Sequence, residues 1–329
     1  MIKVGIVGGA GYTAGELIRI LVNHPQAEIV FVNSQSNAGN PVCSVHAGLT
    51  GECDLVFTDR LPLDAVDVLF LCTAHGDSSK FLAANGLADA EGRVSLPEGL
   101  KVIDLAQDYR DESHGFVYGL PELNRERIAR TDRLANPGCF ATCLQLALLP
   151  LAAAGLLQDE VHIQAITGST GAGVKPSATS HFSWRNDNIS VYKAFKHQHL
   201  IEIGRNVRLL QPSFESDINF VPMRGDFARG IFASVYTRCP LTQEEAEVLY
   251  ENFYREAAFT FVTRDNIDMK QVVNTNKALV HVEKHGDKLL VLSTIDNLLK
   301  GASGQAVQNM NLMYGLDETC GLRLKNIAF

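Results

Sequence analysis

The sequence predicts an α/β protein built from a Rossmann-type parallel sheet and a second, α+β part with a mainly antiparallel sheet. Three observations lead to this prediction. The chain opens with a strand, a glycine-rich turn and a helix within residues 2–22, and buried strands recur at 67–72 and 101–105. The β-rich segments 217–221, 230–239, 280–284 and 288–295 then accompany one clear helix, 242–258. At 329 residues the chain is long for one core, so two domains are expected.

Composition excludes several classes of function. The net charge is −8, and no basic stripe is present that could neutralise the phosphates of a nucleic acid. No apolar run approaches the roughly 18 residues of a membrane span, and a cytoplasmic location is expected. The seven cysteines are scattered without a CxxC pair, which predicts neither a disulfide framework nor a metal site.

The N-terminal turn predicts dinucleotide binding. The strand Ile2–Val7 leads into glycines at positions 8, 9, 11 and 15, and a helical pattern follows. Such glycines permit a tight turn and let the backbone approach a pyrophosphate, which then rests on the helix N-terminus. The predicted cofactor contacts in this turn are Gly8, Gly11, Tyr12, Thr13 and Ala14.

The end of the second strand, Glu28–Asn33, favours NADP over NAD. A carboxylate about 20 residues after the glycines would bind the ribose of NAD. Here the sequence is instead Asn33-Ser34-Gln35-Ser36-Asn37, and no carboxylate occurs before Glu52. Ser34, Ser36 and Asn37 are therefore expected to donate hydrogen bonds to NADP, although no arginine is close in sequence.

Polar residues also follow two further strands. Ala74 and His75 lie in a loop expected to contact the cofactor, and Arg110 follows the next strand on the ligand side of the sheet. Arg110 is either a salt-bridge partner or a clamp for carboxylate or phosphate. A second glycine-rich loop, 168–173, is expected to cover the nicotinamide end, with Gly171 and Gly173 as contacts.

Cys139 is the predicted nucleophile. It follows the corner Asn136-Pro137-Gly138 and leads into an apolar helical run. Unpaired N–H groups and the helix dipole stabilise a thiolate at such a position. His197 or His199 could exchange protons with a reacting carbonyl, although either could equally be a capping or core histidine. The arginines at 224 and 229 are further candidates for binding an anion.

The segment 296–315 is predicted to be helical, with small residues on one side, and to return to the first domain. The sequence therefore places a dinucleotide-binding domain at 1–138 plus 300–329. It places a catalytic and oligomerisation domain at 139–299, since a largely antiparallel sheet often forms a subunit interface.

With these pieces in place, the chain resembles the N-acetyl-γ-glutamyl-phosphate reductase family of arginine biosynthesis, within the wider aspartate-semialdehyde dehydrogenase-like group. The resemblance covers nearly the whole length. It is carried by the glycine turn 8–15, Thr73-Ala74-His75, Tyr109-Arg110, the stretch 136–142, the loop 168–173, His197-Gln198-His199 with Glu202-Ile203, and the stretch 296–301.

The resemblance implies that NADPH reduces an N-acyl-glutamyl 5-phosphate to the 5-semialdehyde with release of phosphate, through a thioester on the family's cysteine, Cys139. It places the acid/base histidine at His197, with His199 as the alternative. It also implies a homo-oligomer (dimer or tetramer). The residues expected to bind substrate are Arg110, Asn136, His199, Glu202 and Arg229, and Asn297 is expected to contact the cofactor.

Two positions depart from the family pattern. Cys143 stands where a small residue is usual, and Ile201 stands where a proline is common. They raise the hypothesis of an N-succinyl rather than an N-acetyl substrate. Three other functions remain open: an aspartate- or aminoadipate-semialdehyde dehydrogenase, a dehydrogenase that uses histidine without covalent catalysis, and a non-enzymatic NADP-binding sensor.

Overall fold

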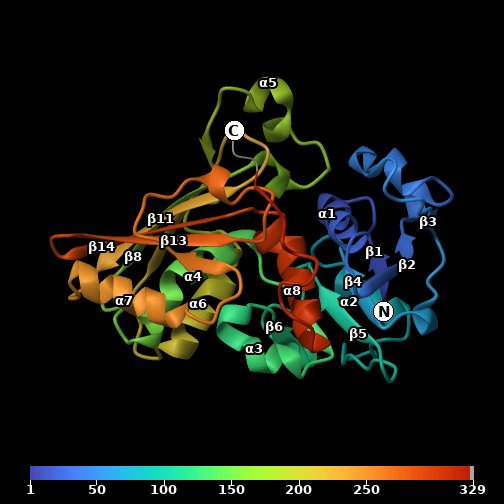
Figure 1. Ribbon diagram of the computed structural model, residues 1–329, viewed down its shortest axis with the longest axis horizontal. Coiled ribbons are helices and arrows are strands. Elements are labelled where there is room, and N and C mark those ends of the chain that lie inside the picture. Colours follow the sequence, from blue (N-terminus) through green and yellow to red (C-terminus); the bar gives the residue numbers. More distant parts are fainter. Residues whose placement is uncertain (327–329) are drawn as a thin grey trace. The chain divides into compact units, whose positions relative to one another are not determined.

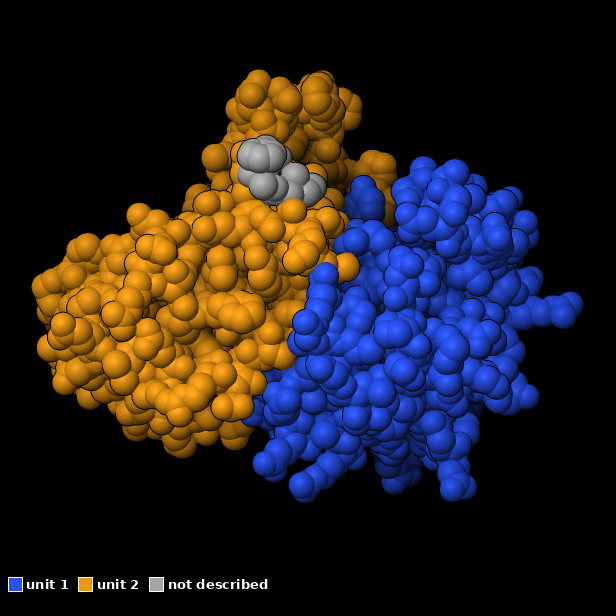
Figure 2. Space-filling model, viewed as in Figure 1, with its two compact units in different colours: residues 1–137, 302–323 blue, residues 138–301, 324–329 orange. Residues whose placement is uncertain are grey.

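The structure is a computed structural model that describes residues 1–326, and these form two compact units (Figures 1 and 2). Unit 1 comprises residues 1–137 and 302–323, and unit 2 comprises residues 138–301 and the chain from 324 on. The chain passes from unit 1 to unit 2 between Pro137 and Gly138, inside the stretch 136–139. It returns to unit 1 between Gly301 and Ala302, at the end of the 296–301 stretch. None of the helices described is long and apolar enough to span a membrane.

Unit 1 contains one seven-stranded sheet in the order β3-β2-β1-β4-β5-β7-β6, and all its strand pairs are parallel. The predicted Rossmann-type sheet is therefore confirmed. The strands are β1 (Ile2–Val7), β2 (Ala27–Asn33), β3 (Phe57–Thr58), β4 (Val68–Leu71), β5 (Lys101–Asp104), β6 (Val117–Tyr118) and β7 (Arg133–Ala135). The helices are α1 (Tyr12–Leu21), α2 (Ser78–Ala84), α3 (Pro121–Ala129) and α8 (Gly304–Met313).

The centre of this sheet is apolar because parallel strands are covered on both faces. All four residues of β4 are buried, and so is every residue of β1 except Lys3. The carboxyl ends of parallel strands meet at one edge, which is where the structure places the glycine turn, the loop after β2 and Arg110. The fold thus gathers the predicted ligand contacts of unit 1 at one edge of its sheet.

The glycine turn packs directly against neighbouring backbone. Gly8 has a φ of +79°, and a Cβ at this position would lie 2.5 Å from the carbonyl oxygen of Cys72. The amide of Gly9 donates to the Asn33 carbonyl at 2.8 Å, which ties the turn to the end of β2. By contrast, a Cβ on Gly11 would meet only the Gly8 oxygen, at 3.8 Å. The turn is therefore close to the sheet on one side and open at the start of α1.

Unit 2 contains a second seven-stranded sheet in the order β12-β13-β14-β11-β8-β10-β9. It is mixed: β8–β10 and β12–β13 are parallel, and the other four pairs are antiparallel. Its strands are β8 (Val161–Thr167), β9 (Ser190–Val191), β10 (Ile218–Arg224), β11 (Ile231–Arg238), β12 (Thr260–Val262), β13 (Ala278–His285) and β14 (Lys288–Ile295). Its helices are α4 (Cys139–Ala153), α5 (Phe182–Arg185), α6 (His199–Leu210) and α7 (Gln243–Phe253).

Helix α4 forms the core of unit 2. Every residue from Phe140 to Ala152 is buried, and the helix packs on β11 and β14 and beside α6 (Figure 1). Tyr250 and Tyr254 donate their hydroxyl protons to the α4 carbonyls of Ala147 and Leu146. The predicted helix at 242–258 corresponds to α7, which begins with a capping box of Thr242 and Glu245.

The segment predicted as one helix from residue 296 is in fact divided. Residues 296–298 are not helical, a π-helical turn covers Leu299–Ser303, and α8 follows from Gly304. The prediction of a continuous helix was wrong at its start, because the Asp296 side chain bonds the backbone N–H groups of Leu298 and Leu299 and so fixes a cap-like turn there. Residues 302–323 belong to unit 1.

Candidate active site

Cys139 is the first residue of α4, as the sequence predicted, and it is partly exposed. The helix behind it is buried from Phe140 to Ala152, so the thiol lies at an accessible end of an otherwise buried element. Gly301 lies against the cysteine, because a Cβ on Gly301 would come within 2.9 Å of the Cys139 Cβ. The positive end of the α4 dipole favours the thiolate form at this position.

The first turn of α6 brings Glu202 and His199 to the same corner. The Glu202 carboxylate accepts the backbone N–H of Gly138 at 3.2 Å, and its other oxygen lies 3.9 Å from His199 Nε2. Gly138 has to be glycine, since a Cβ there would overlap the His199 ring. Both buried side chains therefore contact the residue that precedes the nucleophile.

His197 is also buried, in an aromatic cage. Its ring lies 5.5 Å from Phe140, 5.5 Å from Phe220, 5.8 Å from Tyr192 and 4.6 Å from His199, measured between ring centroids. Burial, helped by the positive charges of Lys193 and Arg224, lowers the pKa of His197 to about 4. The side chain is therefore neutral near pH 7.

The hydrogen bonding of His197 assigns its tautomer. The backbone N–H of His199 donates to His197 Nδ1 at 3.2 Å, so the neutral ring carries its proton on Nε2. The ring therefore carries no positive charge near pH 7. The ring is instead a neutral N–H donor.

The structure adds Tyr192, which was not assigned to the site from sequence, and places it beside Arg224, one of the two arginines that the sequence offered as anion-binding candidates. The Arg224 guanidinium lies 4.6 Å from the centre of the Tyr192 ring, and both groups face His197. Burial raises the pKa of Tyr192 to about 12, and charge on Cys139 acts in the same direction. Tyr192 directly follows the two-residue strand β9, which pairs Val191 with Met223 and Ser190 with Arg224, and a strand this short gave no usable signal in the sequence.

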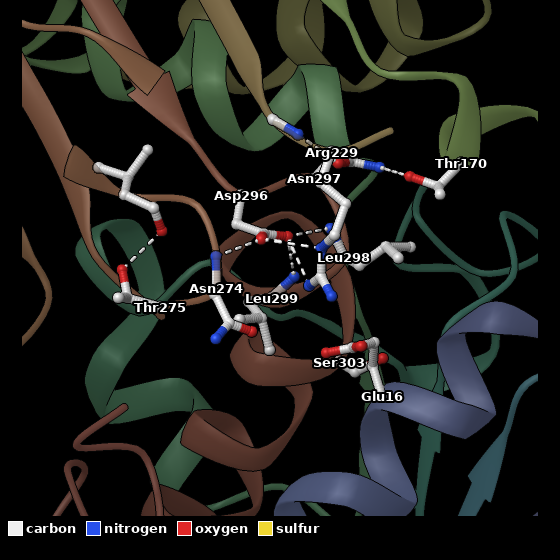
Figure 3. Close-up of polar contacts among 12 residues, drawn as sticks. Glu16, Thr170, Arg229, Asn274, Thr275, Asp296, Asn297, Leu298, Leu299 and Ser303 are labelled. Atoms are coloured by element: carbon white, nitrogen blue, oxygen red, sulfur yellow. Dashed lines mark hydrogen bonds and ion pairs between the residues drawn. The ribbon is translucent and has the colours of Figure 1, made fainter. Parts of the chain in front are cut away.

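Arg229, predicted to bind substrate, is held in an ion pair. Its Nε and a terminal nitrogen each donate to the Asp296 carboxylate at 3.0 Å (Figure 3). Asp296 is fully buried and also accepts the backbone N–H groups of Asn274, Leu298 and Leu299. This bidentate geometry makes Arg229 a support for the 296–301 stretch, and its role as a substrate contact stays a prediction.

Asn297 has both ends of its amide engaged. Its oxygen accepts the Gly230 N–H at 2.8 Å, and its nitrogen donates to the Thr170 hydroxyl at 3.0 Å (Figure 3). Asn297 therefore fixes the loop 168–173 to the end of β14, with Gly171 next to its amide. Gly173 lies further along this loop, exposed and with a φ of +79°. The cofactor contacts predicted for Gly171, Gly173 and Asn297 stay predictions.

In unit 1, Arg110 and Asn136 are joined at the end of β5 and β7. Arg110 Nε donates to the Asn136 carbonyl at 2.9 Å, and a terminal nitrogen of Arg110 donates to the Leu105 carbonyl at 3.3 Å. The Asn136 amide bonds Ala302 and Asn309, both within unit 1. Asn136 thus has structural partners for both ends of its side chain, and its contact with substrate stays a prediction.

The predicted cofactor residues of unit 1 lie at the open end of the glycine turn and on adjacent loops. Tyr12, Ala74 and His75 are exposed, whereas Ala14 and Ser34 are buried. The residues fit a dinucleotide: the Gly11 position is open, where a pyrophosphate would meet the start of α1. Across residues 1–326, no three His, Cys, Asp or Glu side chains are arranged to hold a metal ion.

Comparison with known families first defines the class. Residues 3–131 match the model of the semialdehyde dehydrogenase NAD binding domain, and residues 139–297 match that of the semialdehyde dehydrogenase dimerisation domain. The predicted nucleophile is thus the first residue of the second match. The chain is built as a semialdehyde dehydrogenase.

Relatives define the family more narrowly. The chain is 61% identical to an N-acetyl-gamma-glutamyl-phosphate reductase of Phocaeicola vulgatus and 62% identical to one of Bacteroides thetaiotaomicron, with all of both chains covered in each case. At this identity, the chain belongs to the N-acetyl-gamma-glutamyl-phosphate reductase family, as the motifs of the sequence predicted.

Solved structures agree on the fold. Aspartate semialdehyde dehydrogenase II of Vibrio cholerae, complexed with ASA, superposes with a TM-score of 0.73 at 16% identity and covers 96% of this chain and 98% of its own. The enzyme of Candida albicans, solved with NADP, gives 0.70 at 15% identity, with 95% and 98% covered. These two comparisons support the architecture alone.

Asp296 gives the first testable prediction. Asp296→Asn leaves the guanidinium of Arg229 without its buried counter-charge, so we expect a loss of about 3 kcal/mol or more in the free energy of unfolding. Denaturant titration of the full chain measures this loss. Asp287→Asn is the control, because Asp287 pairs only with exposed lysine and arginine side chains and should change stability by less than about 0.5 kcal/mol. Equal stabilities of the two variants would contradict the structural role of Asp296.

Proposed function

We propose that this protein is an NADPH-dependent reductase that converts an N-acyl-L-glutamyl 5-phosphate, in the first place the N-acetyl compound, to the 5-semialdehyde and inorganic phosphate in arginine biosynthesis. The observation that carries the proposal is Cys139 at the partly exposed start of α4, with the His199 and His197 rings against its neighbours Gly138 and Phe140, in a chain of this reductase family. The reaction class is that of EC 1.2.1.38, an oxidoreductase acting on an acyl phosphate.

The chemistry begins at sulfur. The Cys139 thiolate attacks the acyl carbon, the carbon–oxygen bond to phosphate breaks, and a thioester remains on the cysteine while phosphate leaves. Bound NADPH supplies the hydride that reduces this thioester. The resulting thiohemiacetal collapses as its carbon–sulfur bond breaks, which releases the aldehyde and restores the thiolate.

The chain contributes hydrogen-bond donors to these steps. In this proposal, backbone N–H groups at the start of α4 donate to the oxygen that becomes negative, and each such donor is worth about 3 kcal/mol in enzymes where it has been removed. His197 carries its proton on Nε2, and in this proposal Nε2–H donates to the same oxygen and takes part in proton transfer as the thiohemiacetal forms and collapses. Glu202 and His199 hold Gly138 and thereby position the helix start.

The acyl group is N-acetyl in this proposal. The hypothesis of an N-succinyl substrate rested on Cys143 and Ile201. Cys143 is fully buried and bonded to Ser293, and Ile201 is 74% exposed on α6. Neither geometry supplies a group that would bind a second carboxylate. Steady-state kcat/KM for the N-acetyl and N-succinyl phosphates separates the two.

Cys139→Ser and Cys143→Ser test the covalent step. Oxidation of N-acetylglutamate 5-semialdehyde with NADP and phosphate is the reverse reaction and is followed by absorbance. We expect Cys139→Ser to lose at least about 10³-fold in kcat, because a serine hydroxyl is deprotonated far less readily than a cysteine thiol. Cys143→Ser, which retains a hydroxyl for Ser293, should stay within about threefold of wild type.

The same assay separates the alternatives. Activity without phosphate that persists in Cys139→Ser would favour a dehydrogenase using histidine alone. A higher kcat/KM with aspartate or aminoadipate semialdehyde would identify that compound as the substrate and leave the covalent mechanism unchanged. Binding of NADP with no turnover of any of these compounds would favour a sensor.

The titration of His197 gives another prediction. Since its pKa is lowered to about 4, the neutral Nε2–H tautomer should persist from pH 7 down to about pH 5, and the ring should gain its second proton only below that. NMR of the imidazole nitrogens, assigned with His197→Gln, measures this directly. An imidazolium signal for His197 at pH 6.5 would contradict the assignment.

We further propose that unit 2 forms a homodimer through the open face of its sheet, consistent with its match to a dimerisation domain. Helices α4, α6 and α7 cover one face (Figure 1). The other carries partly exposed apolar side chains on neighbouring strands: Ile166, Phe232, Tyr236, Leu290 and Leu292.

Charge placed on this face tests the dimer. Phe232→Asp should lower the molar mass measured by light scattering, because it puts a carboxylate into the apolar contact. Val248→Asp on the exposed side of α7 is the matched control and should leave the mass unchanged. An unchanged mass in Phe232→Asp would exclude this face, and a monomeric wild type would exclude the dimer.

A further inference from the structure

The loop that follows β2 carries three polar side chains beside the glycine turn. β2 ends at Asn33, and the Asn33 carbonyl accepts the N–H of Gly9 at 2.8 Å. The next residues, Ser34 to Asn37, therefore begin beside Gly9 of the glycine turn. In dinucleotide-binding folds, this edge of the sheet faces the adenosine ribose and its 2′ substituent.

Asn37 binds two serines at once. Its Nδ2 donates to Ser34 Oγ at 3.0 Å and to Ser36 Oγ at 3.1 Å. An amide nitrogen carries two hydrogens, so each serine receives one. Ser34 is buried, Asn37 is partly exposed and Ser36 is exposed, so the group lies at the surface of unit 1.

This arrangement leaves both serine protons available. A hydroxyl has a single proton to donate, and here each hydroxyl oxygen is already an acceptor for Asn37. Within residues 1–326, neither hydroxyl donates to a protein acceptor. The loop also lacks a carboxylate, so it presents donors and no strong acceptor.

We infer that Asn37 determines the preference for NADP over NAD by holding Ser34 and Ser36 as a pair of outward donors to the 2′-phosphate of the adenosine ribose. The inference rests on the proposed function, in which NADPH is the cofactor. A phosphate only accepts hydrogen bonds at neutral pH, whereas a ribose 2′-hydroxyl is best held by an acceptor. Asn37 does not itself have to touch the phosphate, and it acts as a positioning residue.

Asn37→Asp reverses the polarity with almost no change in size. The new carboxylate accepts both serine protons, which removes two donors and adds a negative charge beside the phosphate. We expect the Kd for NADPH to rise about 100-fold, while the Kd for NADH changes less than threefold or falls. Asn37→Ala, which frees the serines without adding charge, should raise the Kd for NADPH about 10-fold.

Asn40→Asp is the matched control. Asn40 is exposed on the same loop, so the substitution adds the same charge three residues away without contacting either serine. Binding of NADPH and NADH to the full chain is measured by calorimetry, and melting temperatures show that each variant is folded. Adenosine 2′-phosphate and adenosine 5′-phosphate, measured in parallel, report the 2′ site without the nicotinamide.

The outcomes separate clearly. A wild-type preference for NADPH that is lost in Asn37→Asp and kept in Asn40→Asp supports the inference. An unchanged preference in Asn37→Asp, or an equal loss in Asn40→Asp, overturns it. Equal binding of NADPH and NADH by wild type would instead contradict the cofactor of the proposed function and the inference with it. Absence of turnover with intact NADPH preference would contradict only the proposed function.

Discussion

The burial of α4 is the constraint on which the candidate active site depends. Thirteen consecutive residues of this helix, from Phe140 to Ala152, are inaccessible to solvent, and two tyrosine hydroxyls bond its carbonyls. A helix packed in this way has no freedom to slide or rotate without opening the core. Its first residue is therefore fixed in space. A thiolate at that point is stabilised by the helix N-terminus without any loop having to close.

The neighbours of Cys139 are held by interactions that lie outside the helix. Asp296 collects hydrogen bonds from three separate segments, and Gly301 follows five residues later against the cysteine. On the other side, Glu202 and His199 contact Gly138. The corner is thus positioned from two directions by buried carboxylates whose bonds are to backbone N–H groups and one guanidinium. Such bonds resist distortion more than exposed ion pairs would, because their charges are not screened by water.

The parts of the fold and site that the sequence could predict are the ones encoded locally. The glycine turn, the strand alternation of unit 1 and the start of α4 at Cys139 each depend on residues within one or two turns of each other. The ion pair of Arg229 with Asp296 depends instead on strand register: Ile231 lies opposite Ile295, which brings residues 67 positions apart into contact. From sequence, Arg229 was therefore predicted to bind the substrate anion, and its partner Asp296 was not foreseen. Tyr192 was missed for the same reason, since its place follows from a two-residue edge strand.

The electrostatics around His197 connect these observations to the proposed chemistry. Burial, together with the charges of Lys193 and Arg224, lowers its pKa and keeps the ring neutral, and Nδ1 accepts a backbone N–H, which leaves the ring proton on Nε2. An anionic group bound beside the same cations would offset their effect, because an added negative charge favours the protonated ring. The proton affinity of His197 is therefore coupled to the charge of what occupies the site. A histidine of this kind is neutral before the reaction and becomes more basic as an oxyanion forms nearby. It is therefore suited to stabilise the negative charge that develops on that oxygen.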